Sequence, residues 1–291
     1  EDAPTLRLPT FEAYVSQFLE IYTEAVNCRL RSSKPVAVTL SGGLDSGSVA
    51  SLAARRLNQQ NKSLTAYTAV PLYDVQNLVG PNRFGNETKF AQETAAFQPN
   101  IDLRLLSASQ MTPLAGIRKL LAIRNEPDHA GSNSYWIADL LQTTRNQGHG
   151  TLLTGQGGNA SISWNGAPFL TSLRQMQQKE GWKAAVKRIL PRFALHFLLL
   201  RRLQKANWRG TALNPDFAHR INLARRQADS IGEGYDLPES IRTPRELRYA
   251  ILKPDSALMG AIWAELGAGF GVEVRDPTMD KRIVEFTIGV P

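Results

Sequence analysis

The sequence has little cysteine and no long apolar run, and both absences limit what the chain can be. Cys28 is the single cysteine among 291 residues, so no disulfide can form within the chain. This suits a reducing compartment, and we expect the protein in the cytoplasm. The most apolar stretch, residues 193–200, is too short to span a bilayer and is flanked by arginines. The sequence therefore predicts no membrane partner.

Histidine is also scarce, and its four positions form no metal-binding or catalytic pattern. His129, His149, His196 and His219 are scattered, with no HxxxH pair and no Cys/His spacing typical of zinc sites. No Ser–His–Asp triad can be argued from their order. The sequence therefore favours neither a zinc centre nor a serine-hydrolase mechanism.

Positive charge is in excess, and one stretch carries most of it. The net charge is +8, and residues 174–226 hold thirteen Lys or Arg against Glu180 and Asp216. A nucleic-acid-binding surface is one interpretation. It is not favoured, because no aromatic residues are interleaved in the manner of a stacking module. A solvated helical face and a surface that meets an acidic partner are the alternatives.

Residues 36–46, VAVTLSGGLDS, are the most informative stretch. The β-branched apolar run at 36–40 predicts a buried strand, and residues 49–57 are helical in composition. Between them stand two glycines, two serines and an aspartate. In such a strand–turn–helix the glycines let a ligand approach the backbone, and the helix N-terminus favours an anion.

The side chains of this turn suit a phosphate group and a metal ion. Ser41 and Ser46 add hydroxyl donors, and Gly42 and Gly43 leave room at the backbone. Asp45 offers the hard oxygen ligand that Mg²⁺ prefers. The turn is not a Walker A loop, because the lysine of GxxxxGK[ST] is missing. The plainer alternative is an ordinary turn with a capping Ser or Asp.

Apolar runs and helical patterns alternate along the first half of the chain. This alternation predicts an α/β fold with a parallel twisted sheet and helices on both faces. Strands are expected at 36–40, 64–70, 101–106 and 150–154, and helices at 11–31, 87–97, 113–123 and 132–147. A mainly helical C-terminal part follows, with helices within 170–231 and at 247–266, and a short extended piece at 271–275.

A second glycine turn, TGQGGN at residues 154–159, follows the strand expected at 150–154. Ligands bind at the carboxyl ends of parallel strands, so both glycine turns can face one crevice. Alone, the second turn is equally compatible with a flexible loop. Paired with the first turn, it predicts a second wall of the same ligand site.

These stretches resemble the motifs of one family. Residues 41–46 look like the SGGxDS pyrophosphate loop of the N-type ATP pyrophosphatases, and most closely like that of the asparagine synthetase C-terminal (synthetase) domain. Residues 271–286, GVEVRDPTMDKRIVEF, resemble the family's G-[LV]-E-x-R-x-P-[FT]-x-D segment. The resemblance covers about residues 11–291 and implies a fold of the adenine nucleotide alpha hydrolase type.

The second turn resembles the family's S-G-E-G-x-D-E segment but departs from it. Gln156, Asn159 and Ala160 stand where the family carries acids. Because Mg²⁺ prefers carboxylates, the resemblance implies Asp45 as the main metal ligand and Asn159 as a weaker one. Glu126 or Asp128 could then help.

Two further expectations concern the C-terminal part. The family's catalytic lysine is unmatched, since Ala264 and Glu265 occupy its neighbourhood and Lys253 and Lys281 do not align with it. In the segment 271–286, a purely structural role would pair Arg275 with Asp280 or Glu285.

The resemblance implies a two-step reaction with ATP and Mg²⁺ as cofactors. ATP adenylates a carboxylate and releases pyrophosphate, and an amine then displaces AMP. Leu40 and Thr68, at the ends of the first two strands, would frame the adenine and ribose. Gly155 and Gln156 would line the ribose and the acyl-adenylate. Asp45 and Gln156 are then the candidate catalytic residues, beside the pyrophosphate grip of residues 41–46.

The substrates and partners are left open. Aspartate with an amine or ammonia donor is the asparagine synthetase reaction. An acidic peptide side chain joined to the peptide's own N-terminus is the reaction of the similar lasso-peptide macrolactam cyclases. The missing acids also allow a degenerate nucleotide-binding or scaffolding module. A homodimer is a further expectation.

The domain organisation follows from the same patterns. Residues 1–10 are expected to be a linker, and 11–291 an ATP-pyrophosphatase domain with an α/β core at about 34–165 and a basic helical part at about 166–270. The family's N-terminal glutaminase domain is expected to be absent and the C-terminus truncated.

Overall fold

The computed structural model divides the chain into two units. The first contains Glu1–Trp164 and Ala257–Pro291, and the second contains Asn165–Ser256. The structure describes residues 5–79, 84–126, 131–164, 166, 182, 186, 190–204, 213–227, 243–252 and 258–291.

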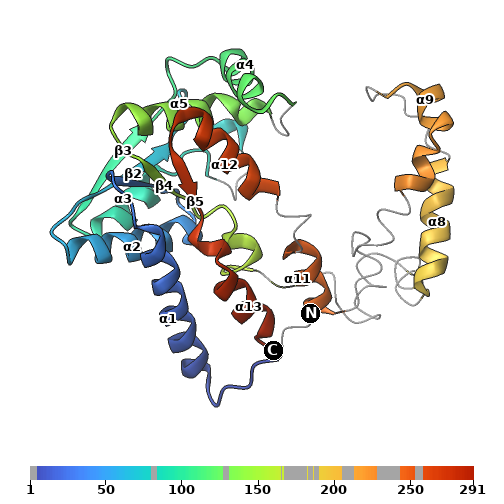
Figure 1. Cartoon of the computed structure of the whole chain (residues 1–291), viewed down its shortest axis with the longest axis horizontal. Helices are drawn as coiled ribbons and strands as arrows, with labels where there is room; N and C mark the ends of the chain where they lie inside the picture. The colour runs from blue at the N-terminus through green and yellow to red at the C-terminus, as the bar shows by residue number, and fades with distance from the viewer. Residues whose placement is uncertain are drawn as a thin grey trace. The chain divides into compact units, whose positions relative to one another are not determined.

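A parallel five-stranded sheet forms the centre of the first unit (Figure 1). Its strands are β1 (Val36–Thr39), β2 (Leu64–Ala69), β3 (Ile101–Leu106), β4 (Thr151–Leu153) and β5 (Glu273–Arg275). They lie in the order β3-β2-β1-β4-β5, and every neighbouring pair is parallel. The predicted parallel α/β sheet is thereby confirmed.

The strand order places a topological switch point between β1 and β4. From β1 the chain proceeds to β2 and β3 on one side, and it later returns to β4 on the other side of β1. Val38 of β1 pairs with Leu153 of β4, so the two strands end beside one another. The two glycine turns follow these strands, and they therefore emerge where parallel sheets bind ligands.

One face of the sheet is covered by three helices near the N-terminus and by the last helix. These are α1 (Phe11–Arg29), α2 (Leu44–Asn58), α3 (Thr88–Ala96) and α13 (Lys281–Gly289). Their shared core contains Val38 from the sheet, Val26 from α1 and Val49 from α2. Figure 1 shows α1 and α13 side by side, and residues of the two helices are in contact.

The opposite face is covered by α4 (Pro113–Arg124), α5 (Ser134–Asn146) and α12 (Leu258–Phe270). Its core contains Ala37 and Tyr67 from the sheet and Leu141 and Leu266 from the helices. Ala37 and Val38 thus point to opposite faces, as the two-residue period of a strand requires. Apolar residues on both faces explain why these strands read as continuous apolar runs.

The expected domain boundary needs a correction at its C-terminal side. The basic helical part was expected to extend to about residue 270, but α12 belongs to the α/β unit, which resumes at Ala257. The reason is packing, because Trp263, Leu266 and Phe270 of α12 lie in the core beside α5. The helical pattern of α12 was visible in the sequence, but the surface that it covers was not.

The expected partners of Arg275 were wrong. Its guanidinium donates to the backbone carbonyls of Arg29 and Arg31 at 2.7 and 2.6 Å, and it pairs with Glu273 at 2.5 Å. Glu273 and Arg275 are two residues apart on β5, so their side chains share one side of the strand. Asp280 instead pairs with Arg29 at 2.6 Å and ties the start of α13 to the end of α1.

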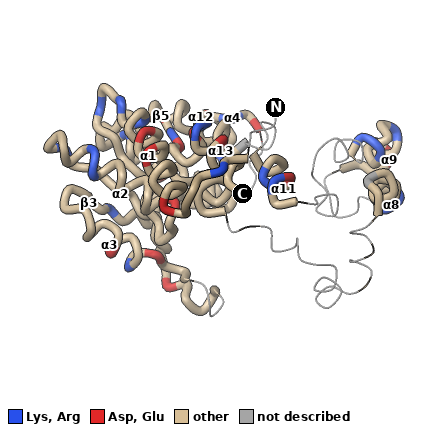
Figure 2. The backbone as a smooth tube through the Cα atoms, turned by 90° about the horizontal axis from the view of Figure 1, so that it is seen from below, with Lys and Arg blue, Asp and Glu red and all other residues tan. Residues whose placement is uncertain are grey.

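The second unit is helical in its described parts. They include α8 (Arg192–Gln204), α9 (Pro215–Arg220) and α11 (Pro244–Leu252). Figure 2 shows lysine and arginine along α8 and α9, which belong to the basic stretch 174–226. Much of that stretch lies outside the described residues. Among the residues that are described, no helix is both long and apolar enough to cross a membrane.

Candidate active site

A cavity of about 620 Å³ lies at the carboxyl ends of the strands. Residues from the ends of β1, β2 and β3, from both glycine turns and from α5 and α12 line it. It includes nine of the ten site residues predicted from the sequence: Leu40, Ser41, Gly43, Asp45, Ser46, Thr68, Gly155, Gln156 and Asn159. The structure therefore brings together two stretches more than a hundred residues apart.

Side-chain hydroxyls hold the first glycine turn in shape. The Ser41 amide donates to Ser46 Oγ at 3.0 Å, and the Ser41 and Ser46 hydroxyl oxygens are 2.8 Å apart. The Gly43 amide donates to Ser41 Oγ at 3.2 Å. No side chain caps the N-terminus of α2, whose N-cap residue is Gly43. The first turn of α2 thus retains N–H groups that favour an anion.

Gly42 differs from the expectation. It is absent from the cavity lining, and its amide donates to Glu87 Oε2 at 3.0 Å. A Cβ on Gly42 would lie 3.0 Å from Phe90 Cβ, so the turn is also tightly packed against α3. Glu87 lines the cavity and was not identified from the sequence. Phosphate binding by the Gly42 amide stays a prediction, and it requires Glu87 to release that amide.

The second glycine turn packs directly on the start of α2. A Cβ on Gly155 would lie 2.8 Å from the Ser46 backbone nitrogen. A Cβ on Gly158 would lie 2.1 Å from Asp45 Cγ. Distances under 3.0 Å are not tolerated between a Cβ and a fixed neighbour, so this close approach depends on glycine. The second turn therefore holds Asp45 in position through its shape.

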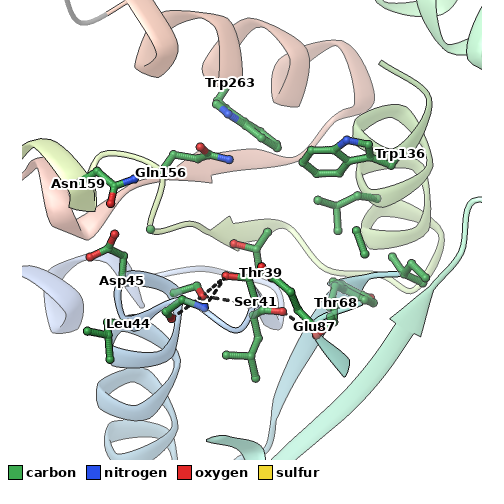
Figure 3. A pocket seen from close by; sticks show the side chains of 18 of the residues that line it. Thr39, Ser41, Leu44, Asp45, Thr68, Glu87, Trp136, Gln156, Asn159 and Trp263 are labelled. Carbon is green, nitrogen blue, oxygen red and sulfur yellow. Dashed lines mark hydrogen bonds between the residues drawn. The ribbon is translucent and has the colours of Figure 1, made fainter. Parts of the chain in front are cut away.

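Asp45 and Asn159 provide the oxygen atoms that suit a metal ion. Figure 3 shows the two side chains pointing toward one another across the gap between the turns. Asp45 Oδ1 is buried and has no hydrogen-bond partner among the described residues. A buried carboxylate oxygen without a partner is costly, and a bound cation would satisfy it. The donor set therefore fits Mg²⁺, with Asp45 as the single carboxylate of the pair.

Of the two other expected metal helpers, only Glu126 lies among the described residues, and it is not at this site. Glu126 forms an ion pair with Arg124 and does not line the cavity. Asp128 and Lys253 lie outside the described residues. Within the part of the chain that is described, no group of three His, Cys, Asp or Glu residues is arranged to hold a metal. At the expected lysine position, Glu265 pairs with Arg124 at 3.1 Å.

A half-buried aspartate from the C-terminal segment, Asp276, fixes the second turn. Asp276 Oδ2 accepts a hydrogen bond from the Gly157 amide at 2.7 Å, and Oδ1 accepts two from Thr278. Burial raises the pKa of the Asp276 carboxyl above its usual range. The segment 271–286 therefore supports the cavity from behind, a role that sequence reasoning did not assign to Asp276.

Thr68 holds the ends of two strands together. Its hydroxyl donates to the Leu40 carbonyl at 2.6 Å, and the Leu40 amide donates to the Tyr67 carbonyl at 2.8 Å. Thr68 is 2% exposed. Leu40 and Thr68 therefore form a rigid floor of the cavity, and their contact with an adenine ring stays a prediction.

The wall opposite the first glycine turn was not predicted from the sequence. It consists of Trp136 and Asp139 on α5 and Trp263 on α12. Burial raises the pKa of the Asp139 carboxyl. Figure 3 shows the side chain of Gln156 between Asn159 and the two tryptophans. Trp263 and Asp139 carried no local signal in the sequence.

Comparison with known proteins agrees with this geometry. A profile described as asparagine synthase matches residues 17–291. No curated protein matched the sequence. Among solved structures, the NH3-dependent NAD synthetase from Campylobacter jejuni subsp. jejuni NCTC 11168, in complex with the nitrate ion, aligns at 11% identity and a TM-score of 0.32. That alignment covers 78% of this chain and 97% of that chain, and we draw nothing from it. Because the profile match spans almost the whole chain, the protein belongs to the asparagine synthase family of ATP-using ligases.

Proposed function

We propose that the protein activates a carboxylate with ATP and joins it to an amine, as an asparagine synthase-like ligase that releases AMP and pyrophosphate. One observation carries this proposal. Two glycine turns at the carboxyl ends of adjacent strands meet around Asp45, whose Oδ1 is buried without a partner. That arrangement suits the pyrophosphate end of ATP better than an uncharged ligand.

In the first step, an oxygen of the substrate carboxylate attacks the α-phosphorus of ATP. The bond from that phosphorus to the bridging oxygen breaks, and pyrophosphate leaves. Ser41, Gly43 and Ser46 would hold the departing group together with the first turn of α2, because they line the cavity and offer hydroxyl and amide donors. Catalysis here depends mainly on positioning and charge neutralisation.

Asp45 and Asn159 would hold Mg²⁺ between the two turns. The ion supplies neutralisation of the phosphate charge. A metal ion is needed for this neutralisation, because none of the described residues that line the cavity is Lys, Arg or His.

In the second step, an amine nitrogen attacks the acyl carbon of the adenylate. The bond from that carbon to the AMP oxygen breaks, the nitrogen loses a proton to water, and the amide and AMP are formed. Gly155 and Gln156 would border the ribose and the acyl group, and Leu40 and Thr68 would frame the adenine and ribose. Gln156 can orient the acyl oxygen through its amide, but it cannot act as a base as a glutamate would.

A second candidate is macrolactam formation within a peptide. It uses the same two steps on an acidic side chain and the peptide's own N-terminus. The aromatic wall formed by Trp136 and Trp263 favours it, since an apolar wall suits a peptide better than free aspartate. The basic stretch 174–226 offers charge for an acidic peptide or partner. For the asparagine synthase-like reaction, we further propose a glutaminase as the ammonia source, and for either reaction a homodimer and a cytoplasmic location.

ATP–pyrophosphate exchange tests the first step. The protein is incubated with ATP, Mg²⁺, labelled pyrophosphate and one acid from a panel of L-aspartate, L-glutamate and an aspartate-containing peptide with a free N-terminus. Exchange with L-aspartate supports the asparagine synthase-like reaction, and exchange only with the peptide supports the cyclase. If ATP binds but no acid supports exchange, the enzymatic proposal is wrong and the chain is a nucleotide-binding module.

A further inference from the structure

We propose that Asp139, Trp136 and Trp263 form a subsite that binds the amine substrate as its ammonium cation. This inference rests on the proposed function, because it assigns the second substrate of the same cavity. It names the chemical class of that substrate: a primary amine that is protonated in solution.

The three side chains converge on one wall of the cavity. Trp136 and Asp139 are three residues apart on α5, so they lie on the same face of the helix. Trp263 approaches from α12, and its ring centroid is 6.4 Å from that of Trp136 at an interplanar angle of 51°. All three line the cavity that also holds both glycine turns. Figure 3 shows the two tryptophans on the far side of Gln156 from Asn159.

Among the carboxylates that line the cavity, Asp139 has no role in the adenylation step. Three carboxylates line the cavity: Asp45, Glu87 and Asp139. Asp45 faces Asn159 at the metal position, and Glu87 accepts the Gly42 amide. Asp139 has no hydrogen bond or ion pair with any residue that the structure describes. Its carboxylate is therefore available to pair with a cationic ligand.

Energetics favour a cation over a neutral group as that partner. Burial raises the pKa of Asp139, which means that its ionised form is disfavoured until an opposite charge arrives. Two indole faces beside it add attraction for a cation through their ring quadrupoles. The adenine of ATP is neutral, and its amino group could offer hydrogen bonds but no charge. An ammonium ion supplies both the charge and three donors.

The subsite also fits the order of the reaction. A primary amine is mostly protonated at neutral pH, so it arrives as an ammonium ion. Bound at Asp139, it transfers one N–H proton to the carboxylate, and the freed lone pair forms the bond to the acyl carbon. The bond from that carbon to AMP breaks at the same centre. The nitrogen loses a second proton to water as the amide forms, and Asp139 returns the first proton to water, so the charges balance.

Direct binding tests the subsite without any turnover. The full chain is titrated with ethylammonium chloride at constant ionic strength, with intrinsic tryptophan fluorescence as the signal and ethanol as the neutral isostere. We expect a saturable change with ethylammonium and none with ethanol. Asp139→Asn should raise the apparent Kd about tenfold or more, since a charge-assisted contact is lost. Glu93→Gln removes one exposed charge from α3 and is the matched control.

Aromatic variants separate the ring contribution from packing. Trp136→Phe keeps a π face, whereas Trp136→Leu keeps only apolar volume. We expect a small rise in the Kd for ethylammonium with Trp136→Phe and a larger rise with Trp136→Leu. Equal effects of the two variants would contradict the cation–π contribution to binding. If the titration of the wild type with ethylammonium does not saturate, the whole subsite is wrong.

Kinetics distinguish this inference from the proposed function. With an acid that supports exchange, amide formation is measured with ammonium, methylamine and hydroxylamine, which is mostly uncharged at neutral pH. Asp139→Asn should raise the KM for ammonium and methylamine about tenfold while leaving hydroxamate formation and pyrophosphate exchange near wild type. A rise in the KM for ATP instead would show that Asp139 binds adenine and would overturn the subsite. Absence of exchange in the wild type would contradict the proposed function. The fluorescence titration would then test binding of the ammonium cation by itself.

Discussion

The two glycine turns occupy equivalent places in the sheet but act through different groups. The first turn follows β1, and its serine hydroxyls and helix N-terminus face the cavity. The second turn follows β4, and its glycines contribute by what they lack, because a Cβ at Gly155 or Gly158 would strike the start of α2. The first turn contributes hydroxyl and amide donors, and the second contributes close packing of its backbone against α2.

Because the second turn acts through its backbone, it can position Asp45 without the acidic side chains that the family motif carries. Gln156, Asn159 and Ala160 remove negative charge, but the close approach of Gly158 to Asp45 depends on backbone alone. The proposed metal position then relies on a single carboxylate, that of Asp45. We therefore expect substitutions in the first turn to abolish chemistry and substitutions in the second to act through the position of Asp45.

Removal of the Asp45 carboxylate should have the largest effect. Asp45→Asn keeps the shape of the side chain but loses the charge, so pyrophosphate exchange should fall by at least about 100-fold. Asp74→Asn, in an exposed loop where Asp74 accepts the Gln76 amide, is the matched control. Exchange within a few-fold of wild type in Asp45→Asn would show that the metal is held elsewhere.

Gly158→Ala tests whether shape alone holds Asp45. The new Cβ would lie 2.1 Å from Asp45 Cγ, so either the turn or the carboxylate must move. We expect a loss of roughly 2 kcal/mol in the free energy of unfolding and about a tenfold loss of exchange. Urea unfolding and the exchange assay measure the two effects.

Gly260→Ala supplies the control for this comparison. Gly260 lies in α12, and a Cβ there would meet nothing within 4 Å. Alanine in an open helical position should stabilise the fold by about 0.5–1 kcal/mol and leave exchange unchanged. If Gly158→Ala behaved like Gly260→Ala, the second turn would be a flexible loop after all.

Asn159→Asp would make the second turn more like the first. It adds a carboxylate opposite Asp45, where the two side chains already face one another (Figure 3). A divalent cation binds more tightly as the ligand charge increases. The Mg²⁺ concentration for half-maximal exchange should fall by roughly three- to tenfold. An unchanged Mg²⁺ requirement would place Asn159 outside the metal's ligands.

The fold and the first turn could be predicted because their signals are local. The strand at 36–40 and the glycines after it are contiguous, and apolar runs on both faces of the sheet identify buried parallel strands. Thr10 and Thr112 cap α1 and α4 with their side chains, and such caps are local because each needs only its own helix. The register of β1 against β4 could not be predicted from the sequence. The position of both glycine turns at one edge of the sheet could, because parallel strands end at the same edge.

Contacts across long sequence separations could not be predicted in the same way. Glu87 reaches Gly42 over 45 residues, and Asp276 reaches Gly157 over 119. Nothing near Glu87 in the sequence distinguishes it from a solvated surface charge. Arg275 shows the same limit, because its partners are carbonyls at the end of α1 and the sequence pattern suggested nearby acids. An acid next to a motif of known geometry, as Asp276 is, was the one usable signal.

The effect of Asp139→Asn on stability should be small and favourable. Burial raises the folded-state pKa of Asp139 above its unfolded value. Its contribution to stability is therefore present below the unfolded pKa and is lost as the pH rises through the folded pKa. Asparagine does not suffer this loss, so the variant should gain on the wild type between about pH 4 and about pH 7. Urea unfolding at both pH values measures the difference, and Asp276, whose pKa is also raised, is present in both proteins and cancels. A variant that loses stability at about pH 7 would mean that Asp139 already has a partner in the folded chain, and it would remove the reason for an ammonium ion to bind there.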